Sequence, residues 1–176
     1  RELKVRRGIF LEFLRALAGN LEDFRVLLFF YWVESCMIAF TGLGLMGIRV
    51  PVRNLVSIGI LHGVAVFLVR GFYSSMGIRF GTHTLVLVLI LSSMITKFTQ
   101  LSWGIGLSAS LLGMVTLILG ESLVLPNFHK MLNMTVDQIW ENPWTHVLAG
   151  YVGDILLVIV TLIVALTNFS LVRIKD

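Results

Sequence analysis

Long apolar runs, separated by short polar or charged connections, follow one another along this chain. Each run has the length of a membrane span rather than the mixed pattern of an amphipathic element, because about 20 helical residues cross the roughly 30 Å hydrocarbon core of a bilayer. The runs cover about 27–46, 54–72, 81–98, 101–125 and 146–168. They predict an all-α fold: a polytopic membrane helix bundle with about five transmembrane helices in a domain at 26–176.

Residues 1–25 follow a different pattern. The apolar residues between Ile9 and Leu17 recur at three- and four-residue spacing, whereas basic residues occupy other positions of the same segment. This pattern predicts a basic amphipathic helix that lies on the membrane surface. Packing of the same helix against a neighbouring domain is an equally good interpretation.

The segment 126–144 is too polar to cross hydrocarbon, so we expect it at a surface or along a cavity. Thr135 and Gln138 have the spacing of a capping box, which predicts a short interfacial helix from about Val136. Pro143 is expected to stop that helix.

Composition agrees with a membrane protein. Hydrophobic residues make up 57% of the chain and charged residues 14%, whereas soluble domains are roughly 45–50% apolar. The net charge is +4, and six of the 14 basic residues precede position 26. This bias indicates contact with anionic lipid headgroups and not with nucleic acid.

The positive charges leave the membrane orientation open. With five spans, nine basic residues lie on the side of the N-terminus and five on the other side, which places the N-terminus in the cytoplasm. Without the six residues of the first segment the count is three to five, and the orientation inverts. We expect a multi-pass protein of the bacterial cytoplasmic membrane in either case.

Several ionisable residues lie within or beside the apolar runs, where a charge is costly unless it meets a partner or water. Each is a candidate either for function or for an interhelical tie. The candidate ties are Glu34, His62 and Asp154. Glu34 with His62, or Glu121 with Arg70, would make such a tie.

Arg70, His83 and Glu121 are the candidates for ligand binding or sensing. If the third and fourth spans form an antiparallel hairpin, the start of one lies level with the end of the other, so His83 and Glu121 meet. Arg70 ends the second span near the same membrane face. Such a cluster suits an anionic or peptide ligand, or a histidine that senses pH.

Other chemistry lacks support in the sequence. Cys36 is the only cysteine, and no HExxH motif or histidine pair at helical spacing is present, so we expect neither a metal site nor a cofactor. No nucleophile and base set is recognisable, so we expect no enzymatic activity. Gly59 and Gly63 form a GxxxG step that predicts close helix packing.

Short motifs in the order found here resemble the N-terminal membrane region of bacterial sensor histidine kinases. The resemblance extends over about 27–168 and does not include a kinase domain. Its motifs are PVR at 51–53, FLVR at 67–70, GTHT at 81–84, GE at 120–121 and NP at 142–143. It implies a sensor and dimerisation region that has no catalytic residues of its own.

Two hypotheses of function follow. The first is a sensor or regulatory module in which a ligand or envelope signal repacks the helices and so reaches a protein partner, or a second copy of the chain. The second is a small-molecule or ion transporter, or the substrate-binding membrane subunit of an uptake system. The sequence shows no inverted repeat to support transport, although a substrate-binding subunit needs none.

Overall fold

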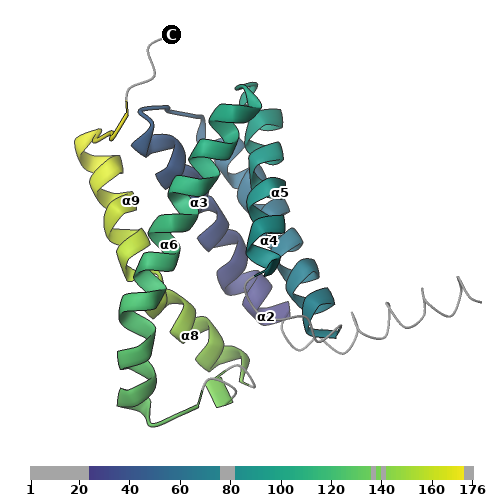
Figure 1. Cartoon of the computed structure of the whole chain (residues 1–176), viewed down its shortest axis with the longest axis vertical. Coiled ribbons are helices and arrows are strands. Elements are labelled where there is room, and N and C mark those ends of the chain that lie inside the picture. Colours follow the sequence, from purple (N-terminus) through teal and green to yellow (C-terminus); the bar gives the residue numbers. More distant parts are fainter. Residues whose placement is uncertain (1–23, 76–81, 136–137, 140–141, 173–176) are drawn as a thin grey trace, which may run out of the picture.

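Helices form nearly all of the part of the chain that the structure describes. A computed structural model describes residues 24–75, 82–135, 138–139 and 142–172, and no strand occurs among them (Figure 1). Residues 1–23 lie outside the described part, so the predicted amphipathic helix stays a prediction. The all-α membrane bundle is confirmed.

The first span is continuous from Phe24 to Leu45 but changes its winding. It consists of α2 (Phe24–Val26), the π-helix η2 (Leu27–Tyr31) and α3 (Trp32–Leu45). A π-helix adds a residue to a turn and is frequently found at functional sites. Here two aromatic side chains of η2, Phe30 and Tyr31, contact Tyr151 and His146 of α8 (Pro143–Gly153).

The next three spans agree with the apolar runs in number and approximate position. They are α4 (Val52–Ser75), α5 (Thr82–Thr99) and α6 (Trp103–Leu132). Gln100 adopts a left-handed conformation with φ of 60°, and Ser102 caps α6, so α5 and α6 form the expected antiparallel hairpin.

For the polar segment, one expectation is corrected and one is confirmed. The helix α6 does not end near 125 but continues through Pro126 to Leu132, where a left-handed Asn133 ends it. Proline lacks one backbone donor, and a helix tolerates this loss where water or a neighbour can satisfy the free carbonyl. The capping box is confirmed, because the Thr135 amide donates to Gln138 Oε1 and the Gln138 amide donates to Thr135 Oγ1. Most of the short helix lies outside the described residues.

The fifth span is broken, where the sequence predicted one continuous helix. The two halves, α8 (Pro143–Gly153) and α9 (Ile155–Thr167), meet at an angle of 51° (Figure 1). Pro143 begins α8 and does not merely stop a helix, since the Asn142 side chain accepts a hydrogen bond from the Trp144 amide and caps it. The described chain therefore has four helices long enough to span a membrane, and five spans if α8 and α9 count as one.

Glycines bring α3 into close contact with its neighbours, as the sequence predicted. A Cβ on Gly63 of α4 would lie 2.8 Å from the backbone nitrogen of Trp32, and a Cβ on Gly113 of α6 would overlap Ile38. α3 also packs against α9, whereas α8 packs against α2, η2 and α6. The protein is thus a multi-pass helix bundle in which α3 is central and α8 lies at one end (Figure 1).

Candidate ligand pocket

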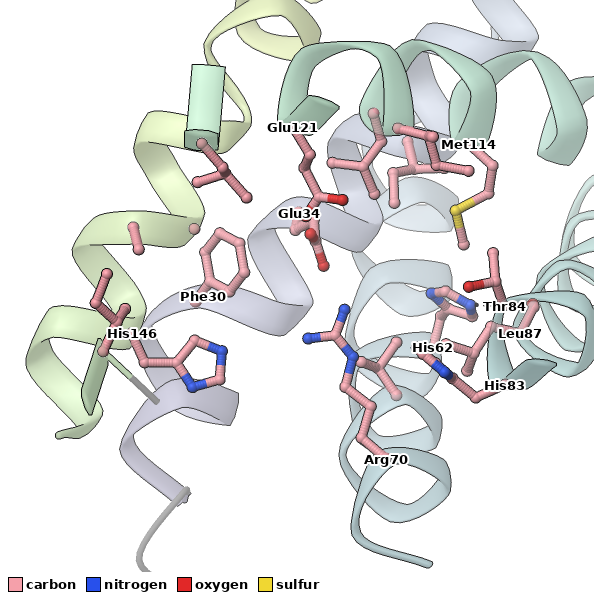
Figure 2. Close-up of a pocket in the computed structure, with 18 of the residues that line it drawn as sticks. Phe30, Glu34, His62, Arg70, His83, Thr84, Leu87, Met114, Glu121 and His146 are labelled. Carbon is pink, nitrogen blue, oxygen red and sulfur yellow. Dashed lines mark hydrogen bonds between the residues drawn. The ribbon is translucent and has the colours of Figure 1, made fainter. Parts of the chain in front are cut away.

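A pocket of about 200 Å³ lies between α8 and the helices that surround α3. Its walls come from η2, α3, α4, α5, α6 and α8, and they are largely aliphatic and aromatic. Figure 2 shows its charged and imidazole side chains gathered around one space. The figure labels Glu34, His62, Arg70, His83, Glu121 and His146, and His129 also lines the pocket.

Arg70 carries the positive charge of the pocket. Its guanidinium lies 5.1 Å from the ring centroid of Tyr31, and its Nη1 donates to the Tyr31 hydroxyl at 3.5 Å. In Figure 2 the guanidinium extends from α4 toward Glu34, with His146 on one side and His62 on the other. The π-helix helps to position Arg70, because Tyr31 is the last residue of η2.

Glu34 and Glu121 face this guanidinium from two other helices. Glu34 on α3 is only 2% exposed, and its Oε1 has no hydrogen-bond partner among the described residues. Glu121 on α6 is partly buried, and both carboxylates interact electrostatically with Arg70. The predicted tie between Glu121 and Arg70 stays a prediction.

His62 is a tie, but not to the predicted partner. Its Nε2 lies 3.2 Å from the Leu87 carbonyl oxygen, and its Nδ1 lies 2.8 Å from Ser35 Oγ. A carbonyl only accepts, so Nε2 carries the proton and Nδ1 accepts from the serine. Both nitrogens are therefore engaged, and the imidazole joins α3, α4 and α5. The expected partner Glu34 is the chain neighbour of Ser35.

The three residues predicted to bind or sense a ligand line the same pocket. His83 at the start of α5 is 4% exposed, and its ring lies 5.9 Å from that of Tyr73. It shares the pocket with Glu121 and Arg70. The structure thus places the three residues around one pocket, whereas a direct meeting of His83 and Glu121 and a role in binding stay predictions.

Asp154 is neither in the pocket wall nor a hydrogen-bonded tie. Its side chain is fully buried at the break between α8 and α9, and neither carboxylate oxygen has a hydrogen-bond partner within the described part of the chain. The prediction of a polar tie at this position is therefore not supported by any hydrogen bond in the structure.

An aromatic contact between η2 and α8 was missed in the sequence. The rings of Phe30 and Tyr151 lie 5.2 Å apart, those of Tyr31 and His146 lie 6.1 Å apart, and the Tyr151 hydroxyl donates to the Phe29 carbonyl. A run of aromatic residues near a membrane interface usually indicates only headgroup contact. Its role in holding α8 depends on the π-helix, which leaves no periodic signal.

The positive charge of Arg70, the carboxyl groups of Glu34 and Glu121 and the apolar walls of the pocket can together recognise a molecule that combines opposite charges with an apolar part. Across the described residues, no group of three or more His, Cys, Asp and Glu side chains is arranged to hold a metal ion. Comparison of the chain with protein-family models, curated protein sequences and solved structures found no match. The resemblance to sensor histidine kinases therefore stays a prediction, and the pocket itself carries the functional argument.

Proposed function

We propose that this integral membrane protein is a sensor module that binds a small zwitterionic molecule and passes its occupancy to a protein partner. The observation that supports this proposal is the pocket, which has Arg70 opposite Glu34 and Glu121, and whose other walls are four histidines and largely apolar side chains. A ligand carboxylate would pair with the guanidinium, and a ligand ammonium would pair with a glutamate. The sensor would act in the bacterial cytoplasmic membrane.

The size of the pocket limits the ligand. A cavity of about 150 Å³ holds benzene, and the pocket here measures about 200 Å³. Sites for drug-sized ligands measure roughly 300–1,000 Å³. An amino acid with an apolar side chain has a suitable size and charge pattern, so leucine is the first probe.

A route from the pocket to the end of the described chain supports a signalling role. His146, Ala149 and Gly150 of α8 line the pocket, and the break at Asp154 joins α8 to α9. Beyond α9, the amides of Leu171 and Val172 donate to the Leu45 carbonyl. A ligand that moves α8 would thereby alter the packing of α9 against α3, which requires different ligand affinities for the two arrangements.

The binding proposal is tested by removing one charge at a time, either from the ligand leucine or from the Arg70 side chain. Thermal stabilisation and calorimetry in detergent should show that leucine binds more tightly than N-acetyl-leucine or leucinamide, each of which lacks one charge. Arg70→Gln should weaken leucine binding roughly ten- to a hundredfold, because a charged hydrogen bond contributes about 1.5–3 kcal/mol. Arg53→Gln, at an exposed position at the start of α4, is the control. Equal affinities for all three ligands would refute zwitterion recognition.

Transmission is tested by measuring the distance between α8 and α6. Spin labels at the exposed positions Leu148 and Leu119, in a Cys36→Ala background, report this distance. Ligand should change it, whereas a control pair at Leu119 and Leu89 of the α5–α6 hairpin should stay constant. An unchanged distance between α8 and α6 with ligand bound would contradict the sensor mechanism.

One observation favours transport as a second candidate function. Broken helices beside a pocket are typical of transporters, whose half-helix ends contact the substrate. The α8–α9 span is broken in this way, and α8 lines the pocket. Uptake of radiolabelled leucine by proteoliposomes discriminates the two functions, because a sensor binds the ligand without accumulating it.

A further inference from the structure

Asp154 lies at the break of the fifth span, where its backbone groups form hydrogen bonds and its carboxyl group forms none among the described residues. Its amide donates to the Gly150 carbonyl at 2.9 Å, and its carbonyl accepts from the Val158 amide at 2.8 Å. Its side chain is 0% exposed, and neither carboxylate oxygen has a hydrogen-bond partner among the described residues. A capping or tying role does not account for this carboxyl group.

The charged groups around Asp154 are predominantly acidic. Glu34 from α3 and Glu121 from α6 both interact repulsively with its carboxylate, and Arg70 from α4 attracts it. The side chain of Glu121 also lies close to the residue before Asp154, since its Cγ would lie 3.3 Å from a Cβ on Gly153. The other titratable groups on the elements packed against α8 and α9 are Arg25 of α2, Tyr31 of η2, Cys36 of α3, His129 and Lys130 of α6, and His146 and Tyr151 of α8.

Three buried or partly buried carboxyl groups thus share one guanidinium. A carboxylate inside a membrane protein is costly to keep ionised unless a cation or hydrogen bonds compensate it. Arg70 can compensate one negative charge, and it faces Glu34 and Glu121 in the pocket. Asp154 has no hydrogen bond to stabilise an anion. The uncharged acid is therefore the form of Asp154 that this packing accommodates.

We propose that Asp154, with Glu34 and Glu121, forms a proton-binding site whose protonation keeps α8 closed against η2 and α6. The closed arrangement is tight at the break, where a Cβ on Gly120 would lie 2.9 Å from the Gly153 carbonyl oxygen. Loss of the proton leaves an anion that must reach water or a cation. Opening at the break provides that access, and raising the pH therefore favours the open arrangement.

The proton site shares Glu34 and Glu121 with the ligand pocket, but its protonation requires no ligand, so it goes beyond the proposed function. Infrared difference spectra of the full chain in lipid nanodiscs, recorded without ligand, should show the C=O band of a buried protonated carboxylic acid that shifts in deuterium oxide. The band should lose intensity as the pH is raised. Asp154→Asn should remove it, and the variant should bind about one proton fewer in a pH titration. Asp137→Asn, an aspartate of the polar segment 126–144, is the matched control.

The spin labels at Leu148 and Leu119 test the coupling to α8. In the wild type the distance should change as the pH rises, and Asp154→Asn should keep the low-pH distance at every pH, because asparagine is neutral like the protonated acid. Absence of the deuterium-sensitive band in the wild type overturns the proposal. A distance change between the labels that follows the sodium concentration, in a protein that shows no such band, also overturns it. The wild-type spectrum decides this even if Asp154→Asn fails to fold. Failed leucine binding alone refutes the proposed function and leaves the proton site standing.

Discussion

Gly63→Ala is expected to separate α3 from α4 and to weaken the tie made by His62. The added Cβ would lie 2.8 Å from both the Cα and the backbone nitrogen of Trp32, whereas ordinary van der Waals contact begins at 3.4 Å. Backbone atoms cannot rotate away, so the helices must separate locally by about 0.6 Å. The residue before Gly63 is His62, whose Nδ1 lies 2.8 Å from Ser35 Oγ. The same separation would lengthen this hydrogen bond to about 3.4 Å, outside the usual range of about 2.7–3.2 Å, and so weaken it.

The energetic terms have opposite signs. Overpacking typically costs about 1–3 kcal/mol, and an unsatisfied buried polar group costs about 1–3 kcal/mol. Alanine offsets at most about 1 kcal/mol of this through its higher helix propensity. We therefore expect the free energy of unfolding to fall by about 1–5 kcal/mol.

Reversible unfolding in mixed detergent micelles, followed by tryptophan fluorescence, measures this change. Gly104→Ala in α6 is the matched control, because a Cβ there meets no atom within 4 Å among the described residues. The control should unfold like the wild type or be slightly more stable. If Gly63→Ala is as stable as Gly104→Ala, the close approach of α3 and α4 is wrong.

Two further substitutions test the walls of the pocket. Ser35→Ala removes the donor to His62 and leaves a buried imidazole nitrogen unsatisfied, so the same unfolding assay should show a loss of about 1–3 kcal/mol. Gly150→Ala places a Cβ 2.7 Å from Cε1 of the Phe30 ring, which lines the pocket, so calorimetry should show weaker leucine binding and the label distance between α8 and α6 should change.

Each of these substitutions has a control in the same chain. Ser57→Ala removes an exposed hydroxyl that donates only to the Arg53 carbonyl of its own helix, and it should be nearly neutral. A loss equal to that of Ser35→Ala would show that the hydroxyl of Ser35 has no special role. Gly104→Ala controls for the alanine itself, and unchanged leucine affinity in Gly150→Ala would argue against α8 as a pocket wall.

Predicting the spans from the sequence depended on one physical constraint. Within hydrocarbon every backbone group must bond inside its own segment, so a long apolar run has few alternatives to a helix. This is why α4 at Val52–Ser75 and α5 at Thr82–Thr99 lie close to the runs at 54–72 and 81–98. The predicted span at 101–125 is shorter than α6, because a proline such as Pro126 usually marks the end of a helix and the turns of α6 beyond it are polar.

The break in the fifth span and the π-helix in the first could not be predicted from apolar length. Both depend on contacts between segments far apart in the chain: the Phe30 ring would meet any Cβ at Gly150, and Gly120 approaches the carbonyl of Gly153. Apolar length and composition are the same for a straight and a bent span. The departure from a straight helix follows from the neighbours that pack on it.

By itself, the sequence determined that this chain is a membrane helix bundle and that costly ionisable residues lie inside it. Only the tertiary structure decided which of them meet. Glu34 and Ser35 are adjacent in the chain, yet one faces Arg70 and the other binds His62, because consecutive helical residues point about 100° apart. The rotation of each helix is set by its packing against the others, and that packing gathers the charges into one pocket while it leaves Asp154 buried at the break.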